Sequence, residues 1–131
     1  MNSTVMEEFR ANNGFVGGFF EKMPLLILHH VGAKSGKAYE MPLAFIHDGE
    51  RMVVCASNGG AAAHPQWYHN LVASPEVKVE LGSGTIAVKA FDVKGLERDR
   101  LYDAVVEAMP VFDEFREKTD REIPVIVFEL V

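Results

Sequence analysis

Residues 25–57, with the sequence LLILHHVGAKSGKAYEMPLAFIHDGERMVVCAS, decide the fold. The apolar run Leu25–Val31 is too short for a typical helix and predicts a strand buried on both faces. Residues 39–47 alternate between two faces, and the Asp-Gly pair that follows them is typical of a hairpin turn into a third strand over 51–57. We therefore predict three strands in meander order, with Pro42 placing the middle strand at an edge or a bulge.

The sequence on either side of this stretch predicts helices and further strands. Spacing, breakers and capping patterns place the elements as follows: a helix from the capping box Thr4-Val5-Met6-Glu7 to Asn12-Asn13-Gly14, a flexible Gly- and Phe-rich flap to residue 20, a helix from Pro65 to Ser74-Pro75, strands over 77–81 and 85–92, an apolar helical stripe over 101–109, a short helix over 112–118 and a strand over 124–130. Strands that follow one another in the sequence, in groups with helices between them, predict a mostly antiparallel α+β barrel. The predicted order of elements after the first helix is β-β-β-α-β-β-α-α-β.

Length and composition limit the classes of protein that this chain can represent. A length of 131 residues, 48% of them hydrophobic, predicts one domain over 1–131 with a real core, including the helix and flap over 1–20. A net charge of −6 argues against a nucleic-acid partner. The single cysteine fits a reducing compartment, and no apolar run approaches the roughly 18 residues of a membrane span. We expect a cytoplasmic protein without an integral membrane segment.

The histidines and the cysteine do not form a recognisable metal or nucleophile motif. His64 and His69 are five residues apart on a predicted helix and therefore face different sides, so no metal is expected. His29 and His30 point to opposite sides of their strand, and at most one of them can face a given cavity. Cys55 alternates along a buried strand, where a thiol behaves as a small apolar group.

Two glycine-rich loops, 32–37 and 57–60, follow strands that we expect to be neighbours. Glycines allow successive N–H groups to converge on an oxyanion, and Lys34 supplies a countercharge, although the first loop is not a Walker motif. Taken alone, a loop of this kind is more often just a turn. Trp67, at the start of a helix, suits a flat electron-poor ring, but a tryptophan that fills the core is also common.

Six segments together carry a family resemblance: EFRAN at 8–12, PLL at 24–26, GAKSGK at 32–37, SNGG at 57–60, HPQWYHNL at 64–71 and KTDREIP at 118–124. They span nearly the whole chain, and the Pro-x-Trp-Tyr-x-Asn-Leu pattern is the most specific of them. On these segments the chain resembles the deazaflavin-dependent nitroreductase family of actinobacteria. The resemblance implies a split β-barrel of the flavin-binding type that uses the deazaflavin coenzyme F420.

The resemblance also implies roles for individual residues. The implied cofactor-binding residues are Lys34, Ser35, Gly36, Tyr39, Pro42, Ser57, Asn58, Gly59, Gly60, Pro65, Gln66, Trp67 and Asn70. The implied substrate-contacting residues are Phe19, Ala44, Met109, Phe112 and Phe115. Ser57 is the candidate catalytic residue, with a polarising role only. The family usually carries basic residues where this chain has Ala33, Tyr39 and Asn58, which predicts weaker binding of an anionic cofactor.

The implied reaction is hydride transfer from the reduced cofactor to a flat, apolar electron acceptor such as a quinone or a nitro compound. The expected location is the cytoplasm, with peripheral contact at the inner face of the membrane as a further option. Two alternatives stay open. One is a non-catalytic split-barrel protein that binds deazaflavin or an apolar ligand such as a fatty acid. The other is an oxidoreductase of the same fold that uses flavin mononucleotide (FMN).

Overall fold

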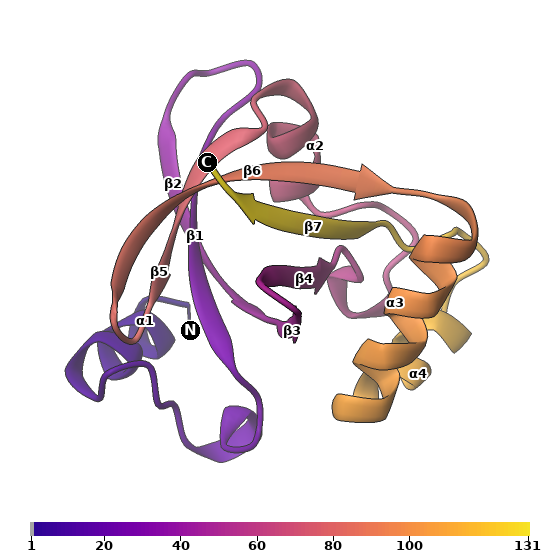
Figure 1. Ribbon diagram of the computed structural model, residues 1–131, viewed down its shortest axis with the longest axis horizontal. Helices are drawn as coiled ribbons and strands as arrows, with labels where there is room; N and C mark the ends of the chain where they lie inside the picture. Colours follow the sequence, from indigo (N-terminus) through magenta and orange to yellow (C-terminus); the bar gives the residue numbers. More distant parts are fainter. Residues whose placement is uncertain (1) are drawn as a thin grey trace.

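A computed structural model describes residues 2–131 and shows a curled seven-stranded sheet in which every pair of neighbouring strands is antiparallel (Figure 1). The strands are β1 Leu25–Val31, β2 Ala38–Ala44, β3 Ile46–Asp48, β4 Arg51–Cys55, β5 Glu76–Leu81, β6 Gly84–Val93 and β7 Val125–Leu130. The helices are α1 Asn2–Ala11, α2 Gln66–Ala73, α3 Gly95–Ala108 and α4 Val111–Glu117, with 3-10 turns η1 Gly18–Phe20 and η2 Asn58–Gly60. The expected mostly antiparallel α+β split barrel is confirmed.

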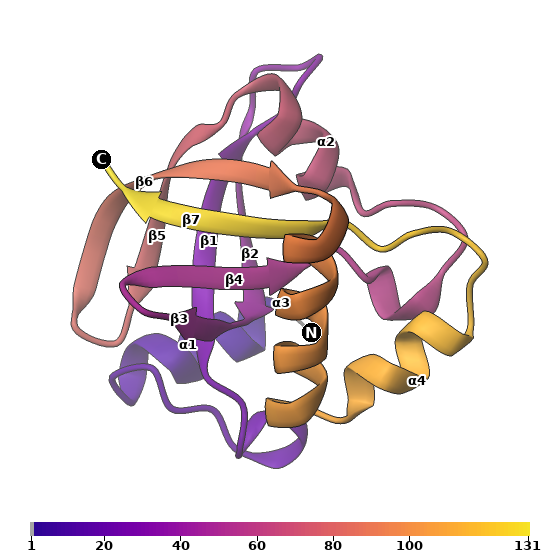
Figure 2. The ribbon, with the colours of Figure 1, turned by 45° about the vertical axis from the view of Figure 1, so that its right-hand side comes forward.

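Phe45 forms the corner that curls this sheet. The strand order is β2-β1-β5-β6-β7-β4-β3, so β2 and β3 are the two edge strands, yet Phe45 alone separates them in the sequence. The two edges must therefore meet at this residue, and the sheet bends round on itself (Figure 2). The N–H of Phe45 donates to the carbonyl oxygen of Pro24 at 3.0 Å, and its side chain is only 5% exposed.

Both pairings of the predicted three-strand meander are present, but this corner divides its middle strand between the two edges of the sheet. Strand β4 pairs with β3 and β7, whereas β2 pairs with β1 and not with β4. The alternating stretch predicted as one strand over 39–47 is split in two, because burying the ring of Phe45 inside the curl carries the chain from one edge to the other. The prediction that Pro42 belongs to an edge strand is confirmed, since β2 is an edge.

Three groups of apolar side chains hold the layers together. Inside the curl, Leu28 and Phe128 of the sheet pack with Trp67 and Leu71 of α2. Helix α3 packs against the outer side of β4 and β7, α4 lies beside α3 and η2, and α1 packs along β1 and β2 (Figure 2). Within residues 2–131, no helix has the length and apolar character needed to cross a bilayer.

The first helix begins earlier than its capping pattern predicts. Helix α1 starts at Asn2, so Thr4 lies within its first turn and is not the cap. The helix is positioned by packing, because Phe9 is buried with Val16 and Ile27 in the group that covers β1. Its predicted end is close to the observed one, as Asn13 has a positive φ of 54° immediately after the helix.

The turn at Asn13 and Gly14 lies directly on Gly82, in the turn between β5 and β6. A Cβ atom at position 82 would overlap the carbonyl oxygen of Asn13. We expect Gly82→Ala to lower the free energy of unfolding by about 1–3 kcal/mol, because the two turns would have to separate. Urea unfolding followed by circular dichroism measures this change. Gly17→Ala is the control, since its Cβ would find only the Glu8 carboxylate at 3.6 Å, and an equal loss in both variants would contradict the prediction.

Candidate functional site

An apolar cavity of about 270 Å³ opens between η1, the middle of β2, the turn after β4 and helix α4. Ten residues predicted for the site line it: Phe19, Pro42, Ala44, Ser57, Asn58, Gly59, Pro65, Trp67, Phe112 and Phe115. Segments from positions 19 to 115 thus converge on one space. The sequence analysis missed six further lining residues, which follow no motif: Phe20, Met23, Met41, Leu43, Cys55 and Val111.

A second hollow, a groove of about 430 Å³, continues from this cavity along the start of α2. The cavity and the groove share four lining residues: Met41, Asn58, Pro65 and Trp67. Tyr39, Gln66 and Asn70, which are also predicted site residues, line the groove, as do two histidines that were not predicted, His30 and His64. An apolar cavity that opens into a more polar groove suits a ligand with a flat ring and a polar side chain.

The turn after β4 presents unpaired backbone donors to the cavity. Ser57 has right-handed helical torsions, and Asn58 follows with a positive φ of 49°. This sequence of torsions makes successive N–H groups converge into a concave anion-binding nest. No hydrogen-bond acceptor within residues 2–131 meets the N–H groups of Ser57, Asn58 or Gly59. The nest can therefore receive a carbonyl or phosphate oxygen of a ligand.

Side-chain chemistry in the cavity comes from Ser57 and not from Cys55. The Ser57 hydroxyl lines the cavity and has no hydrogen-bond partner within the described part of the chain. Burial raises the pKa of the Cys55 thiol to about 12, so the thiol stays protonated at neutral pH. The geometry is consistent with a ligand contact for Ser57 and gives Cys55 an apolar packing role.

Asn70 is committed to contacts within the protein. Its Oδ1 accepts from the N–H of Ala33 at 2.9 Å and from the Nε2 of Gln66 at 3.1 Å, and its Nδ2 donates to the Nδ1 of His30 at 2.9 Å. The side chain is 1% exposed, and the ring of His30 stacks on Tyr39. Asn70 therefore ties the loop over 32–37 to helix α2, which the resemblance alone does not indicate.

Some predicted site residues lie outside both hollows. Lys34, Ser35 and Gly36 form the exposed turn between β1 and β2, with the Ser35 hydroxyl accepting from the N–H of Lys37 at 3.2 Å. Gly60 is buried against helix α4, where a Cβ atom would approach the carbonyl oxygen of Phe115 at 2.8 Å. Met109 directly follows α3, is buried with apolar side chains of α3 and α4, and does not line the cavity.

The histidine reasoning needs one correction. His64 precedes α2 instead of lying on it, and its ring centroid is 5.9 Å from that of His69. The two rings are therefore neighbours, because the chain before the helix folds back toward its first turn. His29 and His30 do lie on opposite faces of β1, with Glu80 and Asn70 as their respective partners.

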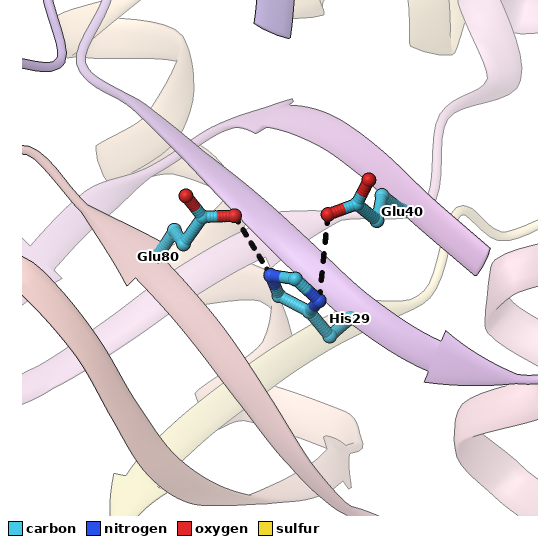
Figure 3. Close-up of side chains that lie close together, drawn as sticks. All are labelled: His29, Glu40 and Glu80. Atoms are coloured by element: carbon cyan, nitrogen blue, oxygen red, sulfur yellow. Dashed lines mark hydrogen bonds and ion pairs between the residues drawn. The ribbon is translucent and has the colours of Figure 1, made fainter. Parts of the chain in front are cut away.

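His29, Glu40 and Glu80 bring three potential metal-ligating groups together on β1, β2 and β5 (Figure 3). The Nε2 of His29 donates to Glu80 at 2.8 Å. Arg10 of α1 also reaches this group, donating to Glu40 at 2.5 Å and to Glu80 at 2.7 Å, and its hydrogen bond lowers the pKa of Glu80. A guanidinium already supplies the positive charge here, so this cluster fastens α1 to the sheet.

A larger hollow, of about 660 Å³, lies between the end of β1, the beginnings of β2 and β5 and the middle of β6. Charged side chains such as Glu40, Glu76 and Lys78 line it, and Tyr39 is its single aromatic residue apart from histidines. Of the predicted site residues it includes Tyr39 alone. The smaller cavity beside Trp67 is the better candidate, because it combines aromatic walls with converging donors.

A family model described as F420H(2)-dependent quinone reductase matches residues 2–130. The F420H(2)-dependent quinone reductase Rv1261c of Mycobacterium tuberculosis (strain ATCC 25618 / H37Rv) is 34% identical over 123 residues, which cover 91% of this chain and 83% of that protein. Rv3178 of the same strain, named as a candidate enzyme of this type, is 40% identical over 110 residues, which cover 84% of this chain and 92% of that protein.

Solved structures agree with these relatives. An F420-H2 dependent reductase called FDR-A superposes with a TM-score of 0.74 at 37% identity, over 81% of this chain and 94% of that one. HutZ, a heme storage protein of Vibrio cholerae, superposes with a TM-score of 0.65 at 13% identity, over 96% of this chain and 87% of that one, and supports the fold alone. The family match and the relatives bear out the expected deazaflavin-dependent oxidoreductase. The chain belongs to the F420H(2)-dependent quinone reductase family, and its cofactor is coenzyme F420.

Proposed function

We propose that the cavity beside Trp67 holds the ring of F420 together with a flat, apolar acceptor, and that the groove along α2 holds the cofactor's side chain. The observation that carries this proposal is the unpaired nest at Ser57, Asn58 and Gly59 on the wall of an otherwise apolar cavity. A deazaflavin ring is flat and carries carbonyl oxygens, so its edge suits the nest while its faces suit aromatic and aliphatic side chains.

The residues present fit this cofactor. Pro42 and Trp67 supply apolar surface beside the nest, and Trp67 is only 5% exposed, so its position is fixed by packing. Gln66 lies along the groove, and Lys34 extends from the turn that Asn70 anchors to α2. We propose these groups as cofactor contacts, with Lys34 placed to meet a phosphate or carboxylate of the cofactor's tail.

The protein's contribution to the reaction is alignment and exclusion of water. When bound, reduced F420 supplies the hydride that passes to the acceptor. Phe19, Phe112 and Phe115 provide apolar walls on the far side of the cavity, and the rings of Phe112 and Phe115 meet edge to face at 5.3 Å. Ser57 can donate its hydroxyl proton in a hydrogen bond to a carbonyl oxygen and polarise it. No ionisable side chain within the described cavity wall is available as a general acid at neutral pH, so the proton that completes reduction comes from solvent.

We also propose a cytoplasmic location with peripheral contact at the membrane's inner face. Two exposed phenylalanines of the segment before β1 support this: Phe15 is 55% exposed and Phe19 is 66% exposed. Exposed aromatic rings partition well into the interfacial region of a bilayer, where a lipid-soluble quinone would be met. Co-sedimentation with anionic vesicles tests the contact, and equal binding by wild type and a Phe15→Ser variant would contradict it.

Fluorescence titration with oxidised F420 is the direct test of the cofactor site. We expect saturable binding of F420 and no saturable binding of FMN at the same concentrations. Reduction of menadione by the F420H2-loaded protein then separates an enzyme from a non-catalytic carrier. Absence of F420 binding by the wild-type protein would overturn the proposed site.

The same titration distinguishes the two lysines of the first loop. Lys34 follows Ala33, whose N–H is fixed to Asn70 on the groove wall, whereas Lys37 lies at the base of β2. We expect Lys34→Ala to weaken F420 binding by about fivefold, equivalent to about 1 kcal/mol for an exposed charge pair. Lys37→Ala is the matched control, and equal losses in the two variants would contradict the assignment of Lys34.

Phe19 is proposed to cover the acceptor. Removing residues 1–20 would expose Leu25 and Ile27 of β1, so a point substitution is the cleaner probe. We expect Phe19→Ala to raise the KM for menadione roughly fivefold, because half-covering an aromatic ring contributes about 1 kcal/mol, while F420 affinity stays the same. Steady-state kinetics measure this. Phe15→Ala is the control, since Phe15 lies at a different hollow, and an unchanged KM for Phe19→Ala would exclude Phe19 from the site.

The contact between His30 and Asn70 predicts a loss of stability in acid. Burial, with His29 nearby, lowers the pKa of His30, so folding favours the neutral ring, whose Nδ1 accepts from Asn70. This stabilisation is complete above a pH of about 6.5, which is the pKa of a histidine in the unfolded chain. It is lost as the pH falls through the lower pKa that His30 has in the folded protein. We expect the free energy of unfolding to decrease between pH 6.5 and 5.5, at a slope of at most about 1.4 kcal/mol per pH unit for this histidine.

His30→Asn checks this assignment. An asparagine Oδ1 can occupy the place of the ring Nδ1 as acceptor and cannot be protonated. Urea unfolding at pH 5.5, 6.5 and 7.5 should therefore show a shallower slope for the variant. A slope as steep as that of the wild type would mean that His30 is not the responsible group.

A further inference from the structure

Arg121, in the segment between α4 and β7, makes the densest set of hydrogen bonds in the described chain to backbone carbonyls of the site. Its guanidinium donates to the carbonyl oxygen of Ser57 at 2.7 Å, to that of Ala61 at 2.9 Å and to that of Ala56 at 3.3 Å. It also donates to the Nδ1 of His64 at 2.8 Å. One side chain thus joins the two ends of the turn that carries the nest.

These bonds occupy the carbonyl side of the turn. A peptide unit directs its C=O and N–H to opposite sides, so fixing the carbonyls of Ala56 and Ser57 also fixes the N–H groups of Ser57 and Asn58. Those two N–H groups, with that of Gly59, are the donors that lack an acceptor within residues 2–131. The positive charge of Arg121 lies behind the same turn and increases the attraction of the nest for an electron-rich oxygen.

A second contact restricts the turn from another side. Gly60 lies against α4 so closely that a Cβ atom would approach the Cβ of Lys118 at 2.9 Å. Asn58 meanwhile donates from its Nδ2 to the carbonyl oxygen of Ala63 at 3.1 Å, and its backbone is in the left-handed region. A conformation that asparagine adopts only occasionally is therefore imposed by several surrounding contacts.

We propose that Arg121 is a positioning residue of the reductase: it holds the turn over 56–61 so that the backbone donors of Ser57, Asn58 and Gly59 converge on the cofactor ring. It does not itself line the cavity or the groove. This inference rests on the proposed cofactor site.

His64 completes the clamp and makes it sensitive to acid. Its Nδ1 accepts from Arg121, so the ring must be neutral, and protonation would place two cations against each other. The titratable and charged groups that face His64 are Arg121, Tyr68, His69, Asp92 and Lys94. Desolvation, then Arg121, lowers the pKa of His64, so the clamp is complete above pH 6.5 and weakens as the pH falls below it.

The test compares Arg121→Lys with a matched control, Arg98→Lys. Lysine keeps the positive charge, but its single ammonium group lacks the forked arrangement of donors with which the guanidinium reaches four acceptors. Arg98 also donates to a backbone carbonyl, that of Ile123, at 2.8 and 3.1 Å, but none of its hydrogen bonds within residues 2–131 reaches the turn over 56–61. Three quantities are measured for each: F420 affinity by fluorescence titration, melting temperature, and the backbone amide shifts of Ser57, Asn58 and Gly59 in the cofactor-free protein by NMR.

We expect Arg121→Lys to weaken F420 binding by about tenfold, which corresponds to the loss of one hydrogen bond made by a charged group. The three amide signals should shift or broaden, and the KM for menadione should stay unchanged. Both variants should lower the melting temperature by a similar amount. Arg98→Lys, however, should leave the three amide signals and the F420 affinity unchanged. A His64→Asn variant, which keeps an acceptor in place of Nδ1, should show a flatter pH dependence of F420 affinity than the wild type.

The outcomes separate this inference from the proposed function. If wild type binds F420 and Arg121→Lys binds it equally, or if Arg98→Lys loses as much affinity, Arg121 has a general structural role and the inference is overturned. If wild type binds no F420, the proposed cofactor site fails; the amide shifts then still decide whether Arg121 shapes the turn, because unchanged signals in Arg121→Lys would overturn that claim on its own.

Discussion

Burial of the Phe45 ring inside the curl is the interaction on which the rest of the molecule depends. It turns one alternating stretch into two strands at opposite edges of a sheet, and it makes those edges meet. A sheet closed in this way has an inside, which α2 fills with Trp67, and an outside, which α1, α3 and α4 cover. The cavity lies where the closure is incomplete, between the middle of β2 and the turn after β4.

The site is assembled from backbone more than from reactive side chains. Its converging donors are peptide N–H groups, its walls are aromatic or aliphatic, and the one buried thiol stays protonated. Such a site suits a reaction in which a cofactor carries out the chemistry, while the protein aligns the reactants and excludes water. The polar side chains near it, Asn70 and Arg121, are occupied in holding its two loops, at 32–37 and 56–61.

The sequence predicts much of this fold because its local signals are strong. Strand β1 has the predicted bounds, and the Asp-Gly hairpin leads into β4. The division of the predicted strand over 39–47 into β2 and β3 could not be predicted, because period-two alternation is the same for one strand and for two strands joined at a buried corner. The loop residues of the site were found through family motifs, and ten of the eighteen implied positions line the cavity together. Arg121 belongs to one of these motifs, but no spacing rule shows that its guanidinium will reach four acceptors far away in the sequence.

The position of β7 in the sheet determines when the site can form during folding. This strand is the last of the seven in the chain, yet it lies between β6 and β4 and pairs with residues of β4 that are 70 (Cys55 with Val125) to 76 (Met52 with Phe128) positions earlier. Arg121 precedes it by only a few residues, so the turn at Ser57 has no clamp until β7 inserts. Pairings so distant in the chain form late in folding. A nascent chain that stops short of β7 can therefore build the β1–β2 hairpin but lacks the clamp on the proposed nest, so on this proposal cofactor binding reports that β7 is in place.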